Sequence, residues 1–329
     1  MTKSEQNEHI EEKQCKVLII GISGGLALIL SRLILQNHPK WEILGIDSRK
    51  TDHIPKVKGL TALRMRYSRG NFENLFRDHE FDYVFHLARI SHSTNHHQSL
   101  NERLELNVMG TNRILDLSLR FHVKKIIILS TFHVYGAYSD NSIFLKEDAP
   151  LKASLKHAEL RDVVEMDQIC TTWMWKYQNE VSCVVLRPCN IIGTQISNTM
   201  SKYLLNQLAL RPIDYNPVFQ FIHEFDMANV LFHSIHSVPT GIYNVATDEF
   251  ISLNEALDII GSKGIPFPIS VASVVNKFLK LSNLQVPDYL IDYLKYSCLI
   301  DNSSLKKHLP QNSFRFNIDE TLKLLKLKS

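Results

Sequence analysis

The chain has 329 residues, of which 44% are hydrophobic, so it is long and apolar enough to bury a sizeable core. Its 37 basic and 34 acidic residues give a formal net charge of +3 and are spread along the chain, which excludes the dense basic surface that holds nucleic acid. Residues 1–14 are polar, and no later apolar run is long enough to span a membrane. We therefore expect a disordered tail at 1–14 and a cytoplasmic protein without nucleic-acid or membrane partners.

Short apolar runs alternate with amphipathic runs along most of the chain. The predicted strands are 15–20, 41–47, 61–67, 81–88, 124–131, 181–188 and 241–247. The predicted helices between them are 25–36, 71–79, 100–121, 153–178 and 225–237. This alternation is typical of an α/β fold, a doubly wound (Rossmann) parallel sheet with helices on both faces.

The predicted elements divide the chain into two interleaved domains. Residues 15–190 and 223–247 would form the Rossmann domain. Residues 191–222 and 248–329 contain more frequent Pro, Asn and Ser, and we assign them to a small C-terminal substrate-binding cap.

The turn after the first predicted strand, "GISGGLA", has small residues at the spacing of a dinucleotide-binding loop. Gly21 permits a tight turn, Gly24 lets the backbone approach a pyrophosphate, and Ala27 lets the next helix pack closely on the sheet. The N-terminus of that helix would point at the phosphates. Ser23 lies inside the same turn, so the predicted cofactor site includes Gly21, Ser23 and Gly24.

A carboxylate ends the second predicted strand, where dinucleotide-binding folds recognise the adenosine ribose. Asp47 at this position would accept hydrogen bonds from the ribose hydroxyls and repel a 2′-phosphate. It therefore favours NAD over NADP as the cofactor. Arg49 and Lys50 follow at once and act against that preference, because a cation attracts the 2′-phosphate.

The order and spacing of the motifs resemble the extended short-chain dehydrogenase/reductases, the superfamily that includes NAD-dependent epimerases and dehydratases. The resemblance covers about residues 15–325. Besides the glycine turn and Asp47, it is carried by "HLA" (86–88), "NVMGT" (107–111), "STFHVYG" (130–136), "LRPCNIIG" (186–193), "FQFIHEFDMA" (219–228) and "GIYNVA" (241–246).

The resemblance implies further residues around the cofactor. The backbone at Leu87 and Ala88 would pass alongside it, and Asn107 would support the nicotinamide side. Pro188 would lie at the junction of nicotinamide and substrate. Asn107 could instead only tie two loops together.

The resemblance also implies residues toward the substrate. Thr131 matches the catalytic Ser/Thr whose hydroxyl bonds the substrate oxygen, although it could simply end its strand. Asn190 would lie beside the substrate. Phe219 replaces the arginine that grips the diphosphate of a sugar nucleotide, and a phenyl ring cannot neutralise a diphosphate, so an apolar or uncharged ligand is also an option.

The chain departs from the family at the Tyr-x-x-x-Lys pair that moves the proton and holds the nicotinamide ribose. Glu159 stands at the tyrosine position and Val163 at the lysine position. Glu159 could act as a substitute acid/base, because a carboxylate beside apolar neighbours has a raised pKa. The alternative is that Glu159 is one more charge on a helix.

Two other patterns are interpreted without a ligand. His92, His96 and His97 lack the intervening glutamate of an H-E-x-x-H metal site, so no metal is predicted. The amphipathic run 271–281 is expected to pack on the cap rather than on a membrane surface.

Three functions therefore remain open from the sequence. The first is an NAD-dependent epimerase/dehydratase-like enzyme acting on a sugar nucleotide or another hydroxy or keto substrate, with Thr131 and Glu159 as catalytic residues. The second is a catalytically silent NAD(H)-binding regulatory or scaffold protein. The third is a structural dimer without a ligand. In each, a homodimer through the helices near 98–121 and 153–178 is expected.

Overall fold

The computed structural model describes residues 14–88, 100–271 and 287–328. The tail predicted at 1–14 lies outside the described residues except for Gln14. The histidines at 92, 96 and 97 and most of the amphipathic run 271–281 lie outside them as well.

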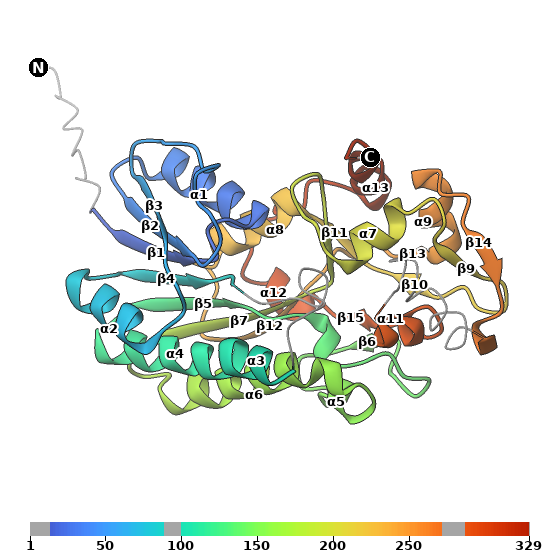
Figure 1. Ribbon diagram of the computed structural model, residues 1–329, viewed down its shortest axis with the longest axis horizontal. Coiled ribbons are helices and arrows are strands. Elements are labelled where there is room, and N and C mark those ends of the chain that lie inside the picture. Colours follow the sequence, from blue (N-terminus) through green and yellow to red (C-terminus); the bar gives the residue numbers. More distant parts are fainter. Residues whose placement is uncertain (1–13, 89–99, 272–286, 329) are drawn as a thin grey trace, which may run out of the picture.

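A seven-stranded parallel sheet forms the centre of the molecule, as the alternating pattern predicts (Figure 1). In spatial order its strands are β12 (Gly241–Val245), β7 (Ser182–Pro188), β5 (Lys125–Leu129), β4 (Tyr83–His86), β1 (Lys16–Ile20), β2 (Glu42–Asp47) and β3 (Leu60–Arg64). The direction of winding reverses between β1 and β4. In open parallel sheets, ligands bind outside the carboxyl ends of the strands at such a reversal.

Helices cover both faces of the sheet (Figure 1). On one face, α1 (Gly25–Asn37) packs against α8 (Glu224–His233). On the other, α4 (Gly110–Arg120) packs between α2 (Arg69–Asp78) and α6 (Arg161–Lys176). Each face has its own buried apolar cluster, and the side chains of β1 point alternately into one and the other. This burial on both faces explains why the strands read as short continuous apolar runs.

The two long helices predicted near 98–121 and 153–178 are more irregular than expected. The first consists of α3 (Leu100–Arg103), the π-helical turn η1 (Leu104–Met109) and α4. The second prediction is wrong before residue 161, because His157 adopts an extended backbone (φ −119°, ψ 95°) between α5 (Ala153–Lys156) and the 3₁₀ turn η3 (Ala158–Leu160). α6 therefore begins only at Arg161.

Short elements from both predicted domains pair beside the carboxyl ends of the large sheet. The two-stranded pairs are β6 (Phe144–Leu145) with β15 (Leu299–Ile300), β8 (Asn190–Ile192) with β11 (Phe221–His223), β9 (Leu210–Pro212) with β14 (Ile265–Phe267), and β10 (Val218–Phe219) with β13 (Ile251–Ser252). The remaining helical elements are η2 (Phe132–Val134), α7 (Thr199–Leu205), α9 (Leu253–Ile260), η4 (Ile269–Val271), α11 (Asp288–Tyr293), α12 (Ser303–Lys306) and α13 (Ile318–Lys326). The predicted division into two domains stays a prediction.

Helix length and hydropathy bear on the membrane prediction. Across the described ranges, no helix combines the length and the apolar character that crossing a membrane requires.

Candidate functional site

The glycine turn after β1 has the tight geometry that the sequence predicts. Gly21 has a φ of +97°, in the region that favours glycine, and its backbone N–H donates to the carbonyl of Ile46 at 2.8 Å. A Cβ on Gly21 would lie 2.9 Å from the backbone nitrogen of Ala88. Gly21 and Ala88 therefore shape the turn through backbone contact, and Gly24 follows as the N-cap of α1.

The N-terminus of α1 opens onto a cavity of about 410 Å³ over the carboxyl ends of the central strands. Six of the residues predicted for the site line it: Ser23, Gly24, Leu87, Thr131, Pro188 and Asn190. The other six do not: Gly21, Asp47, Ala88, Asn107, Glu159 and Phe219. The structure thus brings the glycine turn and Thr131 to one cavity.

Asp47 is occupied by protein partners. Its Oδ2 accepts the backbone N–H of Ser23 at 3.1 Å, and its Oδ1 accepts that of Arg49 at 2.9 Å. The Arg49 guanidinium donates to both oxygens, from Nε at 3.0 Å and Nη2 at 2.8 Å. Burial alone would raise the pKa of Asp47, but the hydrogen bonds and charge of Arg49 outweigh it and lower that pKa. Arg49 lines the cavity and Asp47 does not, so the cavity has an arginine where the sequence predicts the carboxylate of Asp47.

The loop after β8 closes the cavity beside α1. The carbonyl oxygen of Gln195 approaches Gly25 so closely that a Cβ there would lie 2.4 Å from it. Glu224, which is fully buried, holds this loop by accepting the Gln195 backbone N–H at 2.9 Å and the Thr194 hydroxyl at 3.2 Å. Burial raises the pKa of Glu224. Gly25 was not predicted from the sequence, although the second glycine of "SGG" is a signal for a close approach of another backbone segment.

Thr131 and His133 form a pair at the end of β5. The Thr131 Oγ1 accepts the backbone N–H of His133 at 3.3 Å and lies 2.8 Å from the Nδ1 of its ring. Both residues line the cavity, and the His133 ring also contacts the rings of Tyr289 and Tyr293, with centroids 5.5 Å and 5.0 Å away. His133 was not predicted as a site residue from the sequence, although it lies inside the motif "STFHVYG".

The wall contributed by η3 and α6 is apolar where the family pattern has its tyrosine and lysine. Val163 lines the cavity, so a hydrocarbon replaces the ammonium group that would contact the ribose. Leu160, rather than Glu159, provides the other side chain. Glu159 accepts the backbone N–H of Tyr289 on Oε1 at 2.8 Å, and burial raises the pKa of its carboxyl. Its observed contact is therefore with the first turn of α11.

Two other predicted residues lie in the protein interior. The Asn107 Nδ2 donates to the buried Asp162 at 2.7 Å, and Arg103 Nε lies 3.5 Å from the same carboxylate. Phe219 is 4% exposed and stacks on Phe221. Asn107 thus connects two segments of the chain, which was the alternative to a cofactor contact, and Phe219 packs in the core.

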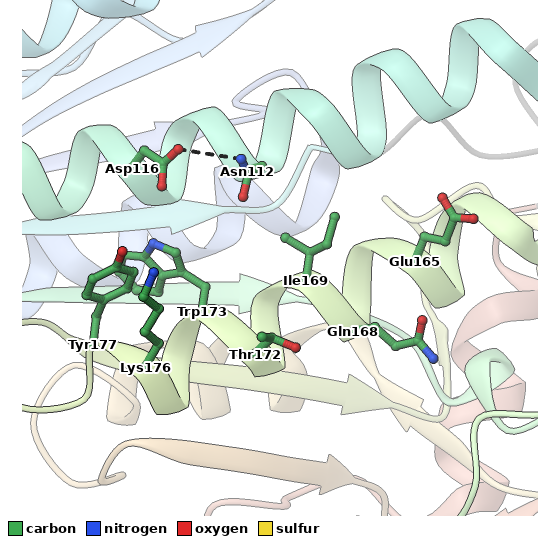
Figure 2. A pocket seen from close by; sticks show the side chains of 9 residues that line it. All are labelled: Asn112, Asp116, Glu165, Gln168, Ile169, Thr172, Trp173, Lys176 and Tyr177. Carbon is green, nitrogen blue, oxygen red and sulfur yellow. Dashed lines mark hydrogen bonds between the residues drawn. The ribbon is translucent and has the colours of Figure 1, made fainter.

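A second cavity of about 490 Å³ lies between α4 and α6, on the surface predicted for the dimer. Figure 2 shows its lining, with Ile169 and Trp173 between the polar side chains and the Asn112 amide donating to Asp116 at 3.5 Å. The Trp173 Nε1 is buried without a hydrogen-bond partner among the described residues. The homodimer itself stays a prediction.

Metal binding finds no support in the described ranges. None of their His, Cys, Asp and Glu side chains gather in groups of three or more that could hold a metal ion.

A sequence model of a known family matches most of the chain. The model describes the NAD dependent epimerase/dehydratase family and matches residues 17–246. The NAD prediction agrees with that description of the family.

Relatives of known sequence have low identity to this chain but align with it over most of its length. An uncharacterised protein of Mycobacterium tuberculosis is 22% identical over 302 residues, which cover 89% of this chain and 78% of that protein. A UDP-glucose 4-epimerase of Dictyostelium discoideum is 24% identical over 293 residues, which cover 76% of this chain and 83% of the epimerase.

Solved structures with the same fold contain NAD. The dTDP-glucose 4,6-dehydratase of Bacillus anthracis in complex with NAD superposes with a TM-score of 0.72 at 14% identity, over 95% of this chain and 96% of that one. The UDP-glucose 4-epimerase of Thermus thermophilus, also with NAD, gives 0.72 at 18% identity, over 95% and 98%. At these identities the likeness establishes the fold and leaves the substrate open.

Proposed function

The chain belongs to the NAD dependent epimerase/dehydratase family, and we propose that it binds NAD(H) in the cavity over the carboxyl ends of its central strands. The observation that carries the proposal is the glycine turn before α1, where Ser23 and Gly24 line the cavity. A Cβ at Gly24 would find only Gly21 O at 3.3 Å and Arg49 at 4.0 Å, so the backbone is accessible to a phosphate. The residues present therefore fit a dinucleotide.

The residues that would hold the cofactor divide along the cavity. Ser23 and Gly24 would hold the pyrophosphate, and Leu87 and Pro188 would lie beside the nicotinamide half. The Asp47–Arg49 pair would face the adenosine ribose. When bound, NAD(H) supplies hydride transfer to or from a carbon that bears a hydroxyl or keto group.

The proposed activity is oxidoreduction on such a carbon, in a sugar nucleotide or another hydroxy or keto compound. It is supported by Thr131, whose hydroxyl lies at the cavity and can bond a substrate oxygen. A catalytically silent NAD(H)-binding protein is the second candidate, which the hydrocarbon wall of Leu160 and Val163 favours. The cavity at the glycine turn does not favour the third candidate, a structural dimer without a ligand.

Titration of the apo chain with NAD and NADP tests the cofactor proposal. In Gly24→Val the new Cβ lies 3.3 Å from the Gly21 carbonyl oxygen, a tight contact that a small backbone shift relieves, and the rest of the side chain enters the space proposed for the phosphates, so the variant should fold and lose NAD binding. Gly70→Val in α2 is the matched control, because a Cβ there meets nothing within 4 Å. Equal NAD affinity in the wild type and Gly24→Val would reject the proposed site.

We also propose that the outer surface of α4 and α6 forms a homodimer. The second cavity, between α4 and α6, is lined by Ile169 and Trp173, and these side chains offer apolar area for a second copy of the chain. A charge in that cavity, as in Ile169→Glu, should shift the sedimentation coefficient from dimer to monomer. A monomeric wild type would refute this proposal and leave the cofactor site unaffected.

A further inference from the structure

The cavity lacks the acid/base pair that its family pattern requires, so another group must move the proton if the chain is active. Among its described lining residues, the ionisable side chains are Arg49, His133, Cys189 and Tyr289. Arg49 is paired with Asp47, and burial raises the pKa of Cys189, which keeps it a thiol. Tyr289 directs its hydroxyl toward Thr199 Oγ1 at 3.5 Å. His133 remains, and its imidazole is the side chain whose ordinary pKa lies nearest neutrality.

The hydrogen bonds of Thr131 allow a contact in which the His133 ring nitrogen accepts. Its Oγ1 accepts the backbone N–H of His133 at 3.3 Å, and its own hydrogen can be donated to the ring nitrogen Nδ1, 2.8 Å away. In that arrangement Nδ1 accepts, and the ring hydrogen resides on Nε2. A neutral imidazole in this tautomer can take a proton through the threonine hydroxyl.

We propose that the Thr131–His133 pair transfers the substrate proton in this chain, with His133 as the base and Thr131 as the group that touches the substrate oxygen. This inference rests on the proposed NAD(H)-dependent function. On oxidation, hydride leaves the substrate carbon for the oxidised nicotinamide cofactor and the carbon–oxygen bond becomes a carbonyl. The hydroxyl proton passes to Thr131 Oγ1 while the threonine proton passes to His133 Nδ1. Reduction reverses both transfers and returns the proton from the imidazolium.

The surroundings of His133 position the ring. Phe132 lies beside it with ring centroids 4.2 Å apart, and Tyr293 donates its hydroxyl to the His133 carbonyl at 3.4 Å. The titratable side chains of α11 near the ring are Tyr289 and Tyr293. Asp292 on the same helix is held by Lys156 and His157, each at 2.6 Å.

The first test reads the tautomer directly, by ¹⁵N NMR of the histidine side chains in the NAD-bound protein with His133→Asn for assignment. The proposal expects His133 to be neutral at pH 7 with its hydrogen on Nε2, and Thr131→Val to change the Nδ1 shift. A hydrogen on Nδ1 would overturn the proposal, because that nitrogen could then accept no proton.

The second test separates proton transfer from hydrogen bonding. Asparagine places an amide oxygen near the position of Nδ1, so His133→Asn keeps an acceptor for Thr131 but cannot take a proton. The probes are NADH with a panel of activated ketones and NAD⁺ with UDP-glucose. We expect a loss of about a hundred- to ten-thousandfold in His133→Asn, the range for a positioned acid/base, with NAD affinity and melting temperature unchanged.

Matched variants distinguish the proposed proton transfer from other causes of lost activity. Thr131→Ser should retain activity and Thr131→Val should lose it, while His236→Asn, which alters a histidine packed against Trp41, is the neutral control. Full activity in His133→Asn, or an equal loss in Tyr289→Phe, would overturn the proposal. So would a wild type that binds NADH but reduces no probe, whereas failure to bind NAD(H) at all would instead reject the proposed function.

Discussion

Removal of the Arg49 guanidinium should shift the cofactor preference toward NAD. The side chain faces the cavity and donates two hydrogen bonds to Asp47. In Arg49→Gln the carboxylate keeps the backbone N–H groups of Ser23 and of position 49. It gains capacity for a ribose hydroxyl, and the cation that would attract a 2′-phosphate is gone.

The expected magnitude follows from the exposure of Arg49. A hydrogen bond to a charged group contributes about 1.5–3 kcal/mol. The Arg49 side chain is 60% exposed, and solvent screening reduces its contribution to about 1 kcal/mol for each cofactor. Because NAD binding strengthens and NADP binding weakens, the two effects add to about 2 kcal/mol, and the ratio of the two affinities should rise about thirtyfold.

Calorimetric titration of the apo chain with each cofactor measures this ratio. Arg77→Gln is the matched control, since its side chain is 59% exposed and pairs with Glu73 on α2, outside the cavity. An unchanged ratio in Arg49→Gln, or a rise in NADP affinity, would refute the assignment of Arg49 to the adenosine end.

Three further substitutions test the turn, the tyrosine position and a buried histidine. Gly21→Ala should lower the free energy of unfolding by about 2 kcal/mol in urea denaturation, because its φ is +97° and Ala88 leaves no room. Gly24→Ala should lower it less, because Gly24 has a φ of −80° and its Cβ would meet only the Gly21 carbonyl oxygen at 3.3 Å and Arg49 at 4.0 Å. Glu159→Gln should leave turnover unchanged, because an amide oxygen still accepts the Tyr289 N–H; a large loss would restore Glu159 as the acid/base. Burial lowers the pKa of His86 to about 4, below the ordinary histidine pKa of about 6.5, because the buried ring is held neutral. The free energy of unfolding is therefore unaffected by this group above pH 6.5 and decreases as the pH falls from about 6.5 through about 4, where the unfolded chain binds the proton first. His86→Gln should therefore reduce the acid-induced loss of stability by up to about 3 kcal/mol, and denaturation curves that respond to pH as the wild type does would contradict this account.

The sheet could be predicted from sequence because its determinants are local. The buried strands of a parallel sheet are continuous apolar runs, and Gly21 and Ala27 lie at fixed spacings from the end of β1. Val163, at the family's lysine position, lines the cavity because the regular helix α6 carries it there.

The details of the site depend on contacts between distant segments, which a local pattern does not contain. The extended backbone of His157 and the 3₁₀ turn after it leave Leu160 at the cavity and let Glu159 meet α11. Asn107 reaches Asp162, 55 residues away. The Thr131–His133 pair is local in sequence, but the role proposed for it depends on the other side chains that line the cavity, which only the structure gives.

The most direct test of the account is to denature freshly purified chain and quantify the released NAD(H) by mass spectrometry. We predict NAD(H) in the wild type and in Gly70→Val, close to one molecule per chain, and none in Gly24→Val. A wild type that releases no NAD(H), and whose apo form binds neither NAD nor NADP, would contradict this prediction and leave the cavity without its proposed ligand.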